Sequence, residues 1–170
     1  GDYTAHLAKA LTRQGKTNVA VLTDVSATPK PCDFEFEVFP ICRGWAPSDI
    51  GRIVVVVRRW KPDLMHIQYP TQGYGRRYLP WLLPVFFRMA GIPVVQTWHG
   101  YDSRRMTCRL LPNSVLSGGL IVVRPEYIDN MQPLYRSLNR RKYTQFIPNA
   151  STIPPARLSA EERSSIRSRF

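Results

Sequence analysis

Residues 64–100 read LMHIQYPTQGYGRRYLPWLLPVFFRMAGIPVVQTWHG, and this stretch decides the fold. Two short apolar runs, residues 64–68 and 92–97, have the length and composition of strands. Between them, residues 76–90 are predicted to form a helix that Gly91 ends. A strand, a helix and a second strand in this order indicate two parallel strands joined by a crossover helix.

The same alternation extends towards the N-terminus. Apolar and small residues at helical spacing predict an amphipathic helix over residues 2–14, which Gly15 stops. Residues 18–23, NVAVLT, form a nearly unbroken apolar run, as expected of a strand covered on both faces. Residues 34–39 alternate apolar and acidic side chains, which is typical of an outer strand with one wet face.

Residues 48–60 fit two interpretations. Four consecutive valines favour a strand, whereas the apolar residues also fall on one face of a helix. We predict a helix, because Ser48 or Asp49 can cap its start and Pro62 forbids its continuation.

The pattern repeats towards the C-terminus. A helix is expected within residues 102–116, with Pro112 as a defect in it. The remaining expected elements are a strand at residues 119–123, a helix at 126–138, a strand at 143–147 and a helix that starts with a capping box from Ser159 to Glu162. Strands separated by helices indicate a Rossmann-like α/β domain, with a doubly wound parallel sheet and right-handed crossovers.

The chain has 170 residues, enough for one domain that buries a core without disulfides or a metal. Its three cysteines, Cys32, Cys42 and Cys108, are odd in number and lack CxxC spacing. Neither a disulfide framework nor a structural zinc site is therefore expected, and a reducing compartment fits best. No apolar run approaches the ~20 residues that span a bilayer, and no signal peptide is visible.

The net charge is +12, and the basic residues occur as pairs and short clusters along the chain. Such an excess favours encounters with phosphates in nucleic acid, anionic lipid or a nucleotide ligand. The charge does not choose among these partners, and each basic pair also fits a solvated helix face. We expect no nucleic-acid partner, because no nucleic-acid-binding module is legible and the basic residues are dispersed over several elements.

Ligands are expected in the loops that follow the strands, because an open parallel sheet binds ligands beyond the carboxyl ends of its strands. The candidate residues in these loops are Tyr69, His99, Gly100, Asp102, Arg124 and Asn149.

His99 is the strongest candidate in these loops. An imidazole at the tip of a strand can hydrogen-bond a sugar hydroxyl, and Gly100 lets a ligand approach the backbone. Asp102 can orient that imidazole, or it can cap the next helix beside an ordinary turn histidine. His66 lies inside a strand, where a hydrogen-bonded core histidine is the simpler interpretation, and His6 is expected at the surface.

Five stretches of the chain resemble the N-terminal domain of the GT-B-fold glycosyltransferases of family 4. They are GDYTAHLAKAL with Gly15 and NVAVLT after it, KPDLMHIQYP, GIPVVQTWHGYD, GGLIVV and FIPNA. They occur in the family's order and at its usual distances, and together they cover most of the chain. Each stretch alone is a weak signal, but five in register are fairly specific.

The resemblance implies a retaining transfer of a sugar from a nucleotide-sugar donor, without a required metal or other cofactor. The acceptor is implied to be a glycan or a lipid-linked molecule, in the synthesis of a polysaccharide, lipopolysaccharide or glycolipid. The N-terminal domain of the family mainly holds the acceptor, and the second domain holds most of the donor. A hydrolase is not expected, because the paired carboxylates of glycoside hydrolysis are absent from the predicted site.

The resemblance also implies roles for individual residues. His99 would reach the donor sugar, Gly100 and Asp102 would shape the same wall of the cleft, and Asn149 would sit at the crossing to the second domain. Gly1 would be the tail of a glycine-rich loop whose backbone amides approach the donor phosphates.

Two loop residues depart from the family pattern. Arg124 stands where the family commonly has a serine, and Ala150 stands where it commonly has glycine. Arg124 and Tyr69 are nevertheless expected to contact the substrate, since both follow strand ends.

The resemblance further predicts a fragment cut at both ends and inactive alone. Residues 1–155 would be the N-terminal domain without its usual first strand, and residues 156–170 would start a linker or helix towards a second domain. Without that first strand, the strands at residues 18–23 and 64–68 would lack their common neighbour and expose unpaired amides.

A basic membrane-surface module without catalysis of its own is the alternative function. It is suggested by basic residues that lie close to aromatic ones, a mixture typical of protein surfaces at lipid headgroups. The residues are Arg76, Arg77, Arg104, Arg105, Tyr74, Tyr78, Trp81, Phe86 and Phe87. Both functions are compatible, because a lipid-linked acceptor lies at such a surface. The expected location is the cytoplasm, either free or as a peripheral protein on the inner membrane face.

Overall fold

A computed structural model describes residues 2–26, 35–69, 74, 77–100, 110–140, 142–149 and 159–168. In chain order the elements are α1 (Asp2–Arg13), β1 (Ala20–Asp24), β2 (Glu37–Cys42), the 3-10 helix η1 (Pro47–Asp49), α2 (Ile50–Trp60), β3 (Met65–Tyr69), α3 (Leu79–Met89), β4 (Val94–Trp98), α4 (Leu110–Leu116), β5 (Gly119–Val122), α5 (Glu126–Asp129), α6 (Pro133–Asn139), β6 (Tyr143–Phe146) and α7 (Ala160–Arg167).

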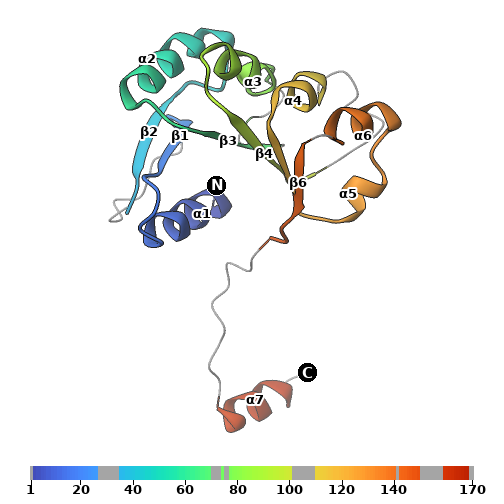
Figure 1. The fold of residues 1–170 in the computed structure, drawn as a ribbon. Coiled ribbons are helices and arrows are strands. Elements are labelled where there is room, and N and C mark those ends of the chain that lie inside the picture. Colours follow the sequence, from blue (N-terminus) through green and yellow to red (C-terminus); the bar gives the residue numbers. More distant parts are fainter. Residues whose placement is uncertain are drawn as a thin grey trace.

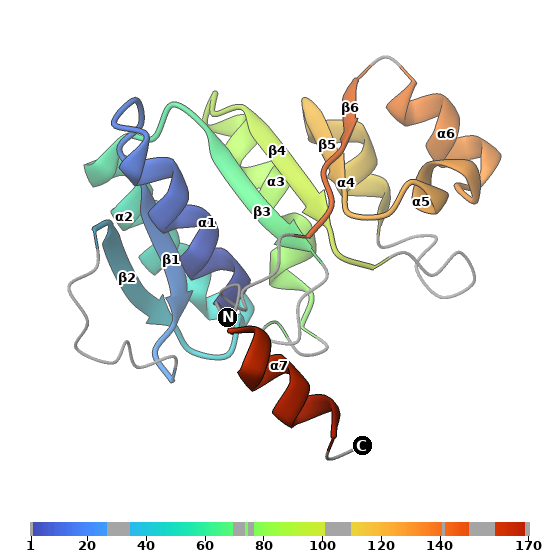
Figure 2. The same ribbon diagram turned by 90° about the horizontal axis from the view of Figure 1, so that it is seen from below.

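All strands in the described part of the chain pair in parallel, in two sheets. β1 pairs with β2, and the second sheet has the order β3-β4-β5-β6. Helices cover both faces: α1 lies on one side, and α2, α3 and α4 lie side by side on the other, as Figure 1 shows from one direction and Figure 2 from below. The prediction of a Rossmann-like α/β fold with parallel strands is confirmed. In the described residues β1 and β3 belong to separate sheets, with no strand between them.

The core lies between the larger sheet and the α3 layer. Ile67, Tyr69 and Trp98 are buried, and by strand alternation and register they share one face of the sheet. Leu83 and Phe87, one turn apart on α3, are also buried in this core. Phe87 therefore belongs to the core rather than to the membrane-facing set in which it was expected.

The outer side of α3 has a different character. Tyr78, Leu82, Phe86 and Met89 recur at helical spacing and all are exposed, Met89 to 82 %. Trp81 turns inward, with its ring edge-on to Tyr69 at a centroid distance of 5.5 Å. α3 thus buries one apolar face in the core and exposes a second apolar face to solvent.

Several element boundaries differ from the sequence predictions. The strand expected at residues 34–39 forms at Glu37–Cys42, and α3 begins at Leu79 rather than at residue 76. The helix expected at residues 126–138 is two helices, α5 and α6, because the chain turns after Asp129 and Pro133 restarts a helix at its first position. Pro112 lies in the first turn of α4, where a missing amide proton costs no helical hydrogen bond. The first part of the helix expected at residues 102–116 lies outside the described residues.

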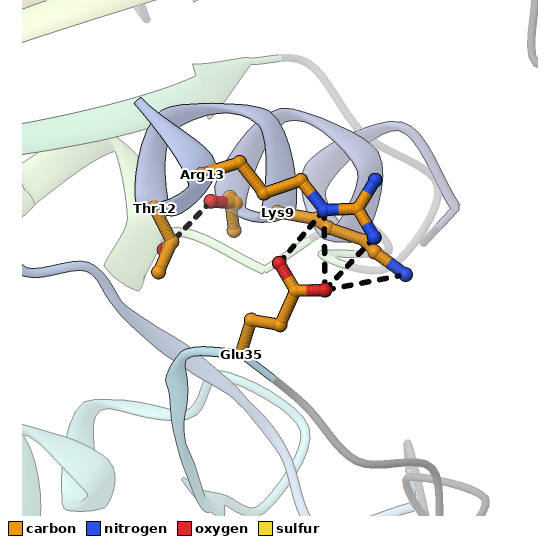
Figure 3. Close-up of polar contacts among 5 residues, drawn as sticks. Lys9, Thr12, Arg13 and Glu35 are labelled. Carbon is orange, nitrogen blue, oxygen red and sulfur yellow. Dashed lines mark hydrogen bonds and ion pairs between the residues drawn. The ribbon is translucent and has the colours of Figure 1, made fainter. Parts of the chain in front are cut away.

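α1 is tied to the lead-in of β2 at the surface. The Arg13 guanidinium donates to both carboxylate oxygens of Glu35, from Nε at 2.8 Å and from Nη2 at 2.9 Å, and Lys9 lies 3.9 Å from the same carboxylate (Figure 3). The two-pronged geometry favours the carboxylate form, so the pKa of Glu35 is lowered by its hydrogen bonds to Arg13. Glu35 thereby links the first helix to the residues just before β2.

The loop between β2 and α2 folds around one buried carboxylate. Asp49 is fully buried, and its Oδ2 accepts hydrogen bonds from the backbone amides of Arg43 at 2.9 Å and Ala46 at 3.1 Å. Its Oδ1 accepts from Arg52 at 2.7 Å. Asp49 is the N-cap residue of α2, yet its side chain serves the preceding loop instead of the free amides of the helix. Asp49 therefore occupies the predicted cap position of α2, but its side chain makes no hydrogen bond that caps the helix.

Replacing buried Asp49 with alanine is expected to destabilise the protein by about 3 kcal/mol, because two backbone amides and one guanidinium lose their acceptor. Urea unfolding at neutral pH measures this change. Ser48→Ala is the matched control, since Ser48 is exposed and adjacent. Equal stabilities of the two variants would contradict the role given to Asp49.

Candidate functional site

The carboxyl ends of four strands meet at one edge of the larger sheet. Tyr69 pairs with Trp98, Trp98 with Val122, and Val122 with Phe146, so β3 to β6 end in register. Hydrogen bonds extend beyond the last strand residues: the His99 amide donates to the Tyr69 carbonyl at 2.8 Å, and the Ile147 amide donates to the Val122 carbonyl at 3.0 Å. The loops after these strands therefore start side by side.

His99 is held by three different elements. Its amide is bonded to β3, and its carbonyl accepts a hydrogen bond from the Tyr127 hydroxyl of α5 at 3.2 Å. The ring of Tyr3, from α1, meets the imidazole edge to face at a centroid distance of 4.7 Å. Such contacts restrict both the backbone and the ring of His99, which is half-buried.

A chain of polar side chains runs from His99 into the sheet. His99 Nε2 lies 2.6 Å from Gln68 Oε1, and Gln68 Nε2 lies 3.2 Å from His66 Nε2. His66 Nε2 also lies 2.7 Å from the Thr97 hydroxyl. The alternation of β3 and β4 puts these side chains on the face opposite to Tyr69 and Trp98. His66 is hydrogen-bonded within the sheet, as the sequence suggested.

Both imidazoles in this series of polar side chains, those of His66 and His99, are biased towards the neutral form. Burial, with a smaller contribution from His99, lowers the pKa of His66 to about 4. Burial also lowers the pKa of His99. A neutral imidazole has one nitrogen that donates and one that accepts, so each ring offers two distinct polar ends.

The other expected site residues fall into three groups. Gly100 is half-buried beside His99, and Arg124 and Asn149 are exposed just after β5 and β6. The side chain of Tyr69 is only 2 % exposed and packs in the core, while its carbonyl holds the His99 amide. Gly1 and Asp102 lie outside the described residues.

Gln68 was not singled out by the sequence reasoning. The available signal was its spacing: His66 and Gln68, two apart, share a strand face, and Thr97 and His99 do so on the next strand. Four hydrogen-bonding residues on one face of adjacent buried strands indicate a network, because unpaired polar groups are costly there.

No metal-binding cluster is found in the part of the chain that the structure describes: no three His, Cys, Asp or Glu residues gather there as ligands. Cys42 is a free, buried thiol whose pKa burial raises to about 12. Among the described helices, none combines the length and apolar character needed to cross a membrane.

A comparison with protein families identifies the family of this chain's residues 1–150. The family described as the glycosyl transferase 4-like domain matches residues 1–150, which is most of the chain. No curated protein and no solved structure matches significantly.

Protonation of His66 is expected to destabilise the fold below neutral pH. Its folded-state pKa of about 4 lies below the unfolded value of 6.5, so between these values the unfolded chain binds the proton first. The stabilisation from neutral His66 is complete above pH 6.5 and is lost progressively down to pH 4, by about 3 kcal/mol in total.

Urea unfolding from pH 7 to pH 4 tests this expectation. His66→Gln should flatten the decline relative to the unaltered protein, because the titrating group is gone. The same substitution at exposed His6 is the matched control. A His66→Gln profile that falls as steeply as the parent profile would show that His66 is not buried in its neutral form.

Proposed function

The chain belongs to the glycosyl transferase 4-like family, and on that premise we propose that it is the acceptor-side part of a retaining glycosyltransferase. It contributes to moving a sugar from a nucleotide-sugar donor to a glycan or lipid-linked acceptor. The proposed product is a polysaccharide, a lipopolysaccharide or a glycolipid.

The position of His99 is the observation that carries this proposal. A half-buried imidazole, biased to its neutral form, lies at the common edge of four parallel strands. Such an edge is where open α/β sheets bind ligands, and a neutral imidazole suits uncharged hydroxyl groups. His99 is the proposed catalytic residue, through a hydrogen bond to a hydroxyl of the donor sugar.

The neighbouring strand ends supply complementary groups. Arg124, exposed after β5, offers a fixed positive charge, and Asn149, exposed after β6, offers an amide that both donates and accepts. Gly100 has no side chain to keep a ligand away from the backbone. These groups suit a ligand that combines hydroxyls with phosphate.

The charges that develop in the transition state determine which groups the enzyme needs on each side of the cleft. Sugar transfer with a diphosphate leaving group develops positive charge on the sugar ring and negative charge on the diphosphate. His99 is proposed to orient the sugar for this change, and Asp102 is proposed to shape the same wall of the cleft. Gly1 is proposed to be the tail of a glycine-rich loop whose backbone amides approach the donor phosphates. The groups that stabilise most of the diphosphate charge are proposed to belong to a second domain of the complete enzyme.

Replacing His99 with alanine in the complete enzyme is expected to lower kcat for sugar transfer about 100-fold, the usual effect of removing one positioned hydrogen-bonding group. The assay measures transfer from a panel of nucleotide sugars, and circular dichroism checks folding. His6→Ala is the control, since His6 is exposed on α1. Unchanged kcat in a folded His99→Ala variant would remove His99 from the site.

A membrane-surface role is the second proposal, and the outer helix layer favours it. Tyr78, Leu82, Phe86 and Met89 line the exposed side of α3, and Val55 and Val115 are exposed on the flanking helices α2 and α4. The sequences of α2, α3 and α4 contain four arginines and no acidic residue. Apolar side chains flanked by cations are the pattern that binds anionic lipid surfaces.

This surface differs in part from the one expected. Phe87 and Trp81 point into the core, and Arg76, Arg104 and Arg105 lie outside the described residues. Arg77 of the expected set is exposed, and the exposed arginines Arg58, Arg59 and Arg88 add to the described positive charge.

Sedimentation with vesicles tests the membrane proposal. Binding to vesicles with anionic lipid is expected to exceed binding to neutral vesicles at least tenfold at low salt, and to weaken as salt screens the charges. Met89→Asp should reduce the binding, whereas Leu64→Asp, an exposed residue outside the helix layer, should not. Equal binding to neutral and anionic vesicles would contradict the charge-driven surface.

A further inference from the structure

Gln68 lies between the two imidazoles of the sheet and contacts both. Its side chain is largely buried, at 7 % exposure, with Oε1 at 2.6 Å from His99 Nε2 and Nε2 at 3.2 Å from His66 Nε2. An amide oxygen can only accept a hydrogen bond and an amide nitrogen can only donate one. The orientation of Gln68 therefore decides which nitrogen of each histidine carries the proton.

The oxygen end of Gln68 requires a donor at His99. His99 Nε2 must carry the proton that Gln68 Oε1 accepts, so in the neutral ring the lone pair is on Nδ1. Within the described residues no group bonds to Nδ1 of His99. The lone pair on Nδ1 is therefore not used by any described group.

The nitrogen end of Gln68 requires an acceptor at His66. His66 Nε2 accepts from Gln68 Nε2 and from the Thr97 hydroxyl, so the proton of neutral His66 is on Nδ1. The two histidines are therefore opposite tautomers, coupled through one amide. Thr97 of β4, a buried residue, lies at the inner end of this series of hydrogen bonds.

We propose that Gln68 is a positioning residue that fixes His99 as its Nε2–H tautomer and so makes the site at His99 an acceptor of hydroxyl protons. The free Nδ1 lone pair attracts the O–H of a sugar and repels the oxygens of a phosphate or carboxylate. Second-layer hydrogen bonds commonly set ring tautomers in this way.

This inference deepens the proposed function and rests on it only for the identity of the ligand as a sugar. The tautomers of His66 and His99 are properties of the chain itself. A measurement of the tautomers can therefore fail or succeed independently of sugar transfer.

Nitrogen-15 NMR of the histidine rings at pH 7 tests the proposal directly. The chain has three histidines, so substitution of each assigns its signals. The expected result is a protonated Nε2 and an unprotonated Nδ1 for His99, with the reverse for His66. A protonated Nδ1 on neutral His99 would overturn the proposal, whether or not the enzyme transfers sugar.

Two substitutions separate positioning from a structural role. Gln68→Met removes both ends of the amide, and the ring of His99 should then show a mixture of tautomers. Gln68→Glu keeps an acceptor for His99 Nε2–H but adds negative charge, so the tautomer should persist and the pKa of His99 should rise. Gln145→Met is the matched control, since Gln145 is a strand glutamine bonded to Tyr143 and not to a histidine.

Activity of the complete enzyme supplies a second readout. Gln68→Met should lower kcat about tenfold, the lower end of effects for such supporting residues, and Gln68→Glu should restore part of the loss with an altered pH profile. A Gln68→Met variant that keeps a single Nε2–H tautomer at His99 would overturn the proposal. Should Gln68→Met fail to fold, the ring measurement on the unaltered chain and on Gln68→Glu still decides it.

Discussion

The parallel register of β3 to β6 is the constraint on which the site depends. Because the strands run the same way and end together, the loops after them begin at one edge. The His99 amide continues this ladder by donating to the Tyr69 carbonyl, so the backbone of the first loop residue is tied to β3. A shift of one residue would turn His99 from its polar face to the packed one.

The two faces of this sheet differ in chemistry: one packs apolar side chains and the other carries a polar hydrogen-bond network. One face buries Tyr69 and Trp98 against the α3 layer, which stabilises the domain through apolar contact. The other carries His66, Gln68 and Thr97, whose burial is tolerated because their polar atoms bond to one another. The same network that satisfies these groups also orients the imidazole at the rim, so packing and site geometry are linked.

Much of the fold could be predicted from sequence, because apolar runs and glycine stops give local signals. The run NVAVLT and the turn at Gly91 predicted a strand and a helix end that the structure contains. The break between α5 and α6 was missed, since the apolar spacing runs across it and only Pro133 marks the restart. The role of Asp49 was missed because its partners Arg43 and Ala46 are fixed by the loop, which no local propensity describes.

The sequence could predict that the candidate site residues follow the strand ends, but not which side chains hydrogen-bond to them. Strand order and the rule for ligand edges pointed to His99 and Arg124, whereas the link through Gln68 needed the register between β3 and β4. The most direct test of the account is to map amide NMR shifts while nucleotide sugars and acceptor glycans are titrated into the chain. The account predicts shifts gathered at His99, Gly100 and the residues that follow β5 and β6. Shifts confined to the outer helix layer, or to the opposite ends of the strands, would contradict it.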